Sequence, residues 1–282
     1  MATINEARIV GYICREPKII NEGVKGEEKV FFQVRTVRRR TEGVSGDIFA
    51  DVMVLYADSD SKSSFLDKMK KYKKYDIVDI DGVVNIILVP KESRCRVCGY
   101  KNIKYNAIST FVYPRQINRL GSYLDYYNEK EESPDALLYK NYAEISNKII
   151  MGGTLITDPA SINLGTGIKC CRYELGVNRS FFVNSQPDQT ADYPWVYSYG
   201  KQAESDLKYL RKEAEVTVKG FLINKTIMAK HTCERCNSIY SYESIGTQLI
   251  PYSVEYHNGH LTDADIEREK ENLKRKKISG GK

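Results

Sequence analysis

The sequence has little of what catalytic sites and membrane spans require. It contains only three histidines, and it has no nucleophile elbow, no phosphate-binding glycine loop and no cluster of carboxylates, so an enzyme has little support. No window approaches the ~18 consecutive apolar residues of a membrane span. Residues 1–6 lack the basic and apolar regions of a signal peptide. We therefore expect a cytoplasmic binding protein without a membrane partner or a small-molecule substrate.

Tryptophan occurs once, whereas tyrosine occurs 21 times among the 282 residues. The net charge of +6 is only mildly basic, which permits a nucleic acid partner without requiring one. Hydrophobic residues make up 41% and charged residues of both signs 28%, which is typical of a folded chain with a buried core. The length fits one large domain or two domains of about 140 residues.

One unit occurs twice along the chain. Gly82 lies 13 residues before Cys95, and Gly220 lies 13 residues before Cys233. Other features repeat at nearly the same offset, namely a strand that ends at a proline and a short amphipathic segment (Pro17 and Pro159; 67–75 and 205–213). Several coincident features at one offset predict an internal duplication.

Each copy predicts the same order of elements: three strands, a short helix and two more strands that form a long hairpin. This is the order of a five-stranded OB barrel. The predicted fold is therefore mainly β, with two tandem five-stranded OB-fold barrels, each with a short helix and a Cys-x-x-Cys hairpin between strands 4 and 5. The expected parts are barrel 1 (1–120), an acidic connector with a helical turn after Pro134 (121–147), barrel 2 (148–260) and a charged C-terminal helix or tail (261–282).

The segment 197–222, YSYGKQAESDLKYLRKEAEVTVKGFL, resembles the bacterial and phage single-stranded DNA-binding protein family. The resemblance lies in an aromatic-Gly-Lys, a helix that ends in Tyr-Leu-Arg-Lys and a strand with a glycine at its exit. It covers about residues 148–256, and the first copy resembles the family only weakly. The family implies an OB fold that coats single-stranded DNA during replication, recombination or transfer, without catalysis. Two barrels per chain would let a homodimer supply the four that the family typically assembles.

The resemblance also implies which residues stack on bases. The family's stacking positions fall on Phe181, Tyr193 and Tyr199, and a fourth falls on Ile227, which is not aromatic. Alignment of the two copies places Tyr56 opposite Tyr199 as the one aromatic match in the first copy. The acidic C-terminal tail of the family is replaced by a basic end.

The alternation of side chains along a strand independently predicts a base-stacking surface that includes Tyr193 and Tyr199. Tyr193, Trp195, Tyr197 and Tyr199 share one face, and four large rings would overfill the interior of a five-stranded barrel. We therefore expect an exposed aromatic row on which bases stack. The alternative is that some of the rings fill the core or a subunit interface.

Basic residues accompany this row. Arg172, Arg179 and Lys201 flank it in the second copy, whereas the first copy has four arginines at the end of its second strand: Arg35, Arg38, Arg39 and Arg40. Neutralised phosphates supply most nonspecific affinity for nucleic acids. The hypothesis is that the first copy contributes charge and the second contributes rings.

The four cysteines of the hairpins form two Cys-x-x-Cys pairs, Cys95 with Cys98 and Cys233 with Cys236. Zinc needs four ligands, and neither copy has a second local pair. The simplest completion is one zinc per chain that is shared by the two hairpins. A site with His231 is a weaker option, because Ser93 stands at the matching place in the first copy. A disulfide or free thiols are the remaining alternatives.

Two other functions remain open. A tandem-OB adaptor would use the aromatic row to bind a protein, and an RNA-binding protein would use it to bind single-stranded RNA, since OB folds bind single strands of either kind.

Overall fold

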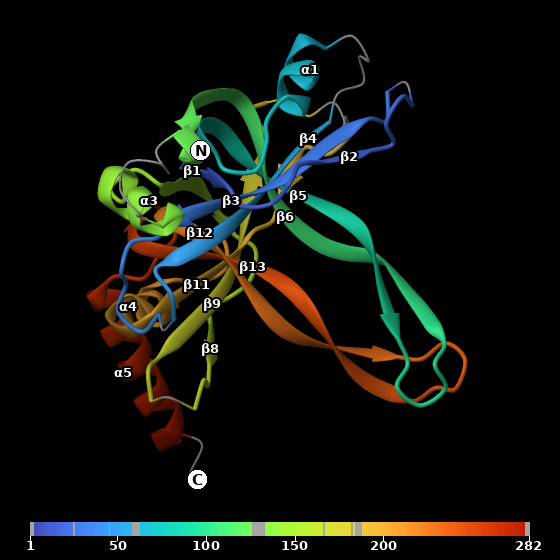
Figure 1. Ribbon diagram of the computed structural model, residues 1–282. Helices are drawn as coiled ribbons and strands as arrows, with labels where there is room; N and C mark the ends of the chain where they lie inside the picture. The colour runs from blue at the N-terminus through green and yellow to red at the C-terminus, as the bar shows by residue number, and fades with distance from the viewer. Residues whose placement is uncertain are drawn as a thin grey trace.

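The computed structural model describes residues 3–279 except 25, 45, 58–62, 126–132, 166, 182 and 184–187 (Figure 1). The elements of the first half are β1 (Ile4–Ile13), β2 (Lys18–Ile20), β3 (Lys29–Val37), β4 (Phe49–Ala57), α1 (Ser64–Lys70), β5 (Asp76–Arg94), β6 (Lys101–Ser122) and α3 (Pro134–Tyr142). Those of the second half are β7 (Asn147–Leu155), β8 (Ala160–Ile162), β9 (Cys170–Asn178), β10 (Ala191–Asp192), β11 (Trp195–Tyr199), α4 (Gly200–Tyr209), β12 (Glu215–Thr232), β13 (Ile239–Tyr256) and α5 (Asp263–Ser279).

Two closed five-stranded barrels account for most of these strands. In barrel 1 the pairing runs β1, β3, β4, β6, β5 and back to β1, and it is closed by one parallel bridge between Val54 and Val112. In barrel 2 it runs β7, β9, β11, β13, β12 and back to β7, with Val196 and Leu249 at the parallel bridge. The predicted fold class is thus confirmed, including the helix between the third and fourth strands.

The alternation of apolar and polar residues explains why these segments form barrel strands. Along β3, Val30, Phe32 and Val34 are fully buried, whereas Phe31 and Gln33 between them are half-exposed. Period-two burial is typical of a strand with one face in the core. The barrel helices close the open ends: α1, for example, starts at the Ser63 cap and buries Leu66 and Met69.

The repeated glycine has a structural reason in both copies. A Cβ at Gly82 would collide with the carbonyl oxygen of Tyr113, and a Cβ at Gly220 would collide with that of Ile250. At both glycines the register of the hairpin shifts, which indicates a β-bulge. The duplicated glycine motif therefore marks the point where each long hairpin bends away from its barrel.

The two barrels share a continuous sheet. Strands β1 and β7 pair antiparallel from Ile4 opposite Gly152 to Ile9 opposite Asn147, and we call this pairing the seam. Beside it, the Asn147 amide spans the two halves because it donates to the Thr36 hydroxyl and to the Leu222 carbonyl. The seam fixes how the barrels face each other.

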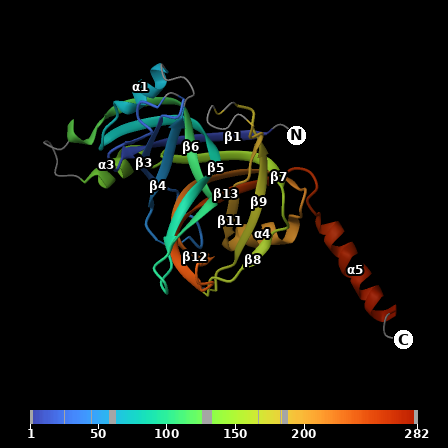
Figure 2. The ribbon, with the colours of Figure 1, turned by 90° about the vertical axis from the view of Figure 1, so that its right-hand side faces the viewer.

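Two long hairpins project from this body and converge. The hairpin of β5 and β6 leaves barrel 1, the hairpin of β12 and β13 leaves barrel 2, and their tips meet (Figure 1). Helix α5 projects from another part of the molecule, away from both barrels (Figure 2). Over the residues described, no helix combines the length and the apolar content needed to cross a bilayer.

Candidate functional site

A cleft of about 310 Å³ lies between the two hairpins, with three rings of the predicted aromatic row on its floor. Tyr193, Trp195 and Tyr197 form this floor. The walls come from both hairpins and are lined by Ile86, Lys91, Ile108 and Thr110 of the first and by Ile227, Ala229, Tyr242, Ser244, Ile245, Gly246 and Thr247 of the second. Residues from both copies therefore build one concave surface.

The floor offers flat rings beside a cation. Tyr193 is 46% exposed, and Trp195 and Tyr197 are half-buried. The guanidinium of Arg172 lies 4.5 Å from the centre of the Trp195 ring, and its buried Nε has no hydrogen-bond partner among the described residues. A cation held against an exposed aromatic floor suits a ligand that has both flat rings and negative charge.

The fourth ring of the row does not belong to this surface. Tyr199 is 5% exposed and packs in a cluster between the barrels with Phe221 and Ile250, so the prediction of four exposed rings is wrong at this position. Burial raises the pKa of the Tyr199 hydroxyl well above its usual value. The neighbouring Lys201 is exposed on α4 and does not line the cleft.

Tyr56 is likewise buried, and the predicted alignment of the copies is one residue out of register. Val54 and Val196 make the equivalent parallel bridges, so Tyr56 is equivalent to Ser198, and Tyr199 is equivalent to Ala57. A slip of one residue exchanges the two faces of a strand. Tyr56 accordingly points into barrel 1, where its ring stacks on Tyr113 at 5.3 Å.

The four arginines of the first copy divide into two pairs. Arg35 is ion-paired with Asp47, Asp51 and Asp135 at 3.1–3.4 Å. Arg38 is 5% exposed and donates to the backbone carbonyl of Asp47, so both guanidinium groups are already held by protein acceptors.

Arg39 and Arg40 are exposed and line a second groove of about 400 Å³ with Lys148 and Tyr252. The guanidinium of Arg39 lies 5.2 Å from the centre of the Tyr252 ring. The predicted positive charge of the first copy thus resides in this pair.

Arg179 has a structural role in place of the predicted contact with nucleic acid. Its side chain is 3% exposed and donates to both carboxylate oxygens of the fully buried Asp192 at 2.7 and 2.8 Å. It also donates to Asn85 of β5, and Asp192 accepts from the Ile86 amide. This network holds barrel 2 against the base of the first hairpin.

The remaining predicted stacking residue, Phe181, is half-buried and packs against the main core.

The cleft walls were not predicted from the sequence. Ile108, Ile227 and Ile245 are each 43–50% exposed within the cleft. Apolar residues that remain exposed in a long hairpin are the signal by which these walls could have been found.

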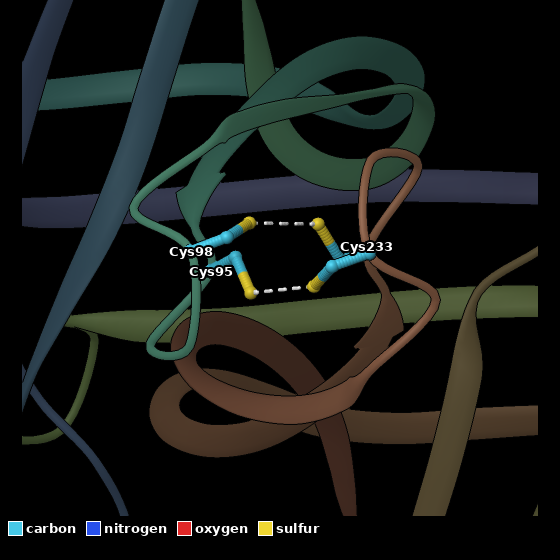
Figure 3. A group of neighbouring side chains, drawn as sticks. Cys95, Cys98 and Cys233 are labelled. Carbon is cyan, nitrogen blue, oxygen red and sulfur yellow. Dashed lines mark hydrogen bonds between the residues drawn. The ribbon is translucent and has the colours of Figure 1, made fainter.

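The four predicted metal ligands come together at the hairpin tips (Figure 3). The Cys95 sulfur lies 3.7 Å from that of Cys236, the Cys98 sulfur lies 3.6 Å from that of Cys233, and all four sulfurs are within 4.8 Å of one another. A tetrahedral zinc with Zn–S bonds near 2.3 Å places its sulfurs about 3.8 Å apart. The observed spacing therefore fits four thiolates around one metal, and it is too long for the ~2.05 Å bond of a disulfide.

Each pair sits on the same kind of turn. The amide of Gly99 donates to the Cys95 carbonyl and the amide of Asn237 donates to the Cys233 carbonyl, and both donor residues have positive φ. Glycine and asparagine tolerate that conformation better than other residues. The turns point both cysteines of each pair toward the opposite hairpin.

Polar groups surround the sulfurs and shift the pKa values of the thiols in different directions. The Ser238 hydroxyl lies 3.3 Å from the Cys95 sulfur, and this hydrogen bond together with nearby backbone amides lowers the pKa of Cys95 to about 6. The backbone of Tyr100 lowers the pKa of Cys98, but burial and the neighbouring cysteines outweigh this effect and raise it to about 12. The buried amide of Asn102 is directed at the Cys233 sulfur from 3.7 Å. His231 is not part of the cluster, and its ring packs edge-on against Tyr240.

Comparison with known proteins finds similarity between part of this chain and single-stranded DNA-binding proteins. Residues 146–244 match the Single-strand binding protein family. Single-stranded DNA-binding protein 1 of Staphylococcus aureus is 36% identical over 76 residues, which are 27% of this chain and 48% of that protein. Single-stranded DNA-binding protein 3 of Clostridium acetobutylicum is 33% identical over 90 residues, or 32% and 61% of the two chains. The chain thus spans only about half to three-fifths of these relatives.

The likeness to solved structures extends over both barrels. The wild-type single-stranded DNA binding protein from Thermus aquaticus aligns with a TM-score of 0.57 over 95% of this chain and 100% of that one, at 14% identity. A deletion mutant of the same protein aligns over 93% of this chain with the same score. At this identity the likeness concerns the fold.

Proposed function

We propose that this chain binds single-stranded DNA in the cleft between its two hairpins, a proposal supported by the match of residues 146–244 to the Single-strand binding protein family. The observation that carries the proposal is the floor of the cleft, where Tyr193, Trp195 and Tyr197 lie beside the Arg172 guanidinium. Bases stack on such rings for about 1–3 kcal/mol each with little sequence preference. The role is binding and protection of the strand during replication, recombination or transfer, without catalysis.

The phosphates are neutralised by a smaller set of residues than the sequence predicted. Arg172 neutralises phosphates at the floor of the cleft, and the exposed Arg39 and Arg40 neutralise phosphates in the second groove. Arg35, Arg38 and Arg179 are left out of this set, because their guanidinium groups are held by protein acceptors. We expect a moderate dependence of affinity on salt, because the slope follows the number of neutralised phosphates.

The test uses the only tryptophan of the chain. Trp195 fluorescence is titrated with oligo(dT), with the matching RNA and with a duplex, at low and moderate salt. Saturable quenching by oligo(dT), which is much weaker with duplex, supports binding of single strands in the cleft, and a stronger response to RNA would make RNA the substrate.

A matched pair of variants controls this titration. Tyr193→Ala removes a ring from the floor, whereas Tyr100→Ala removes a ring of similar exposure outside the cleft. Only Tyr193→Ala is expected to weaken binding. No quenching together with no gel shift would overturn the proposal and favour a protein-binding adaptor.

We further propose that Cys95, Cys98, Cys233 and Cys236 hold one zinc ion per chain. The sulfur spacing supports a closed four-sulfur site, which is the structural type of zinc centre. The bound metal would supply folding free energy at the tips and no reaction chemistry. Thiolate ligands need a reducing compartment, which fits an address in the cytoplasm.

Mass measurement under native conditions tests the metal. One zinc per chain is expected, and Cys98→Ser combined with Cys236→Ser should abolish it. Cys14→Ser, at the half-buried cysteine that follows β1, is the control that should retain the metal. A chain without any metal after purification under reducing conditions would remove the zinc site.

A further inference from the structure

The joined hairpins, the two barrels and the seam form a closed circuit of protein. Starting at the seam, the circuit passes through barrel 1 along β5 and β6 to Cys95 and Cys98, crosses the sulfur cluster, and returns along β12 and β13 through barrel 2. Figure 1 shows the two hairpins leaving the barrels separately and meeting only toward their tips. The circuit is closed at the sulfur cluster.

The aromatic floor lies inside this circuit. The cleft over Trp195 is lined on one side by the first hairpin and on the other by the second. Above it, the Lys91 ammonium reaches across to the Ser244 hydroxyl at 3.2 Å and to the Ile245 carbonyl at 3.1 Å. A ligand on the floor therefore has barrel 2 beneath it, a hairpin on each side and a crossing between the hairpins above it.

Closure of the circuit depends on the sulfur cluster more than on the other contacts across it. Among the described residues and apart from bonds to the sulfurs, these contacts are the hydrogen bonds of Lys91, one between Ser93 and Tyr240 at 2.7 Å, and one from the Glu234 amide to the Asn102 side-chain oxygen at 3.0 Å. Single hydrogen bonds exchange readily with water, whereas four metal–thiolate bonds do not. A projecting two-stranded hairpin is also only marginally stable by itself, so the tips have little else to keep them together.

The tips pack separately from the cores of the barrels. The cysteines and Tyr240 pack in a small cluster of their own, separate from the main core that fills both barrels. Loss of the metal would leave that core and the seam unchanged. The tips are therefore suited to act as a gate.

We propose that the metal-joined tips close over bound single-stranded DNA, so that the strand is enclosed between the aromatic floor and the sulfur cluster. DNA then enters sideways only while the metal is absent, and it leaves the metal-loaded protein only by sliding out at a free end. This inference rests on the proposed binding of single-stranded DNA and on the proposed zinc. It adds a topological constraint that neither of them requires.

Order of addition with circular and linear strands tests the enclosure. The probes are oligo(dT) of about 60 nucleotides in linear and in ligated circular form, longer than the roughly 8–32 nucleotides that two OB folds cover. The full chain, freed of metal by a chelator under reducing conditions, is mixed with each probe before or after addition of zinc. The mixture is then brought to high salt, and retained DNA is measured by gel filtration.

Retention is expected only for circular DNA that was added before zinc. Linear DNA should be lost in either order, and circular DNA added after zinc should also be lost. A chelator applied to the retained complex should release the circle. The Cys98→Ser/Cys236→Ser variant should bind both probes at low salt but retain neither, whereas Cys14→Ser should behave as the unmodified protein does.

The outcomes separate the three proposals. Failure to bind linear oligo(dT) at low salt overturns the proposed function. Binding without uptake of zinc, measured with a chromophoric indicator, overturns the metal site. The enclosure is overturned if the protein binds DNA and takes up zinc but loses circular and linear DNA equally. It is also overturned if circular DNA is still retained after the chelator is added.

Discussion

Substitution of Asp192 by alanine should destabilise the protein strongly, although it removes no large side chain. Asp192 is fully buried and binds both Nε and a terminal nitrogen of Arg179, at 2.7 and 2.8 Å. Removal of one partner of a buried ion pair costs about 3–5 kcal/mol, because the other charge is left without compensation. A loss of that size lowers the melting temperature by about 6–20 °C, at roughly 2–4 °C per kcal/mol for a protein of this size class.

The matched control is Asp81→Ala. Asp81 also binds an arginine, Arg115, at 2.7 Å, but both side chains are about half-exposed. Exposed pairs contribute at most about 1 kcal/mol. Thermal unfolding of both variants, followed by circular dichroism, measures the difference, and equal melting temperatures for Asp192→Ala and Asp81→Ala would refute the assignment of a structural role to Arg179.

Three further predictions concern the division between binding and structural residues. Trp195→Ala should weaken binding of labelled oligo(dT) in an anisotropy titration by about 1–3 kcal/mol, and unchanged affinity would exclude the floor as the stacking surface. Arg39→Gln with Arg40→Gln should reduce the slope of log affinity against log salt by about 0.7 for each lost phosphate contact on a single strand. Arg35→Gln should leave the slope unchanged, because that guanidinium is already ion-paired. The reverse result would contradict this assignment. Tyr56→Ala should lower the free energy of unfolding by about 3–5 kcal/mol in urea titrations, and a loss of DNA affinity in the folded variant would show that its ring contacts DNA after all.

The duplication allowed the fold and the cluster of four cysteines to be predicted from the sequence. Both hairpins carry their cysteines at the same distance from a glycine, and that glycine is the residue at which each hairpin bends. Equal spacing from an equivalent bend places Cys95 and Cys233 at equivalent positions in their hairpins. The prediction of a shared site needed only one more assumption, namely that the two tips meet.

The exposure of individual side chains could not be predicted in the same way. Tyr56 was placed on the wrong face because an alignment error of one residue is undetectable in a weakly matching copy but exchanges the faces of a strand. Arg35 was expected to be free because one of its partners, Asp135, is 100 residues away in the sequence. Burial of a charge depends on such distant partners, which periodicity does not reveal.

The walls of the cleft were missed for a related reason. Ile227 was identified as a departure from the family's aromatic position, yet it lines the same cleft as the rings. Its partner on the opposite wall, Ile108, belongs to the other copy. A surface shared between two repeats cannot be found by analysing each repeat separately.

The seam between β1 and β7 also determines how the chain tolerates division. Six residues of β1, from Ile4 to Ile9, pair with β7, so each barrel covers an open strand edge of the other. A fragment that ends in the connector would expose the backbone amides and carbonyls of that edge to any other strand in solution. Such an edge invites strand addition and aggregation. Each half therefore protects the other from misassembly. The smallest fragment of this protein that stays monodisperse is expected to contain both halves.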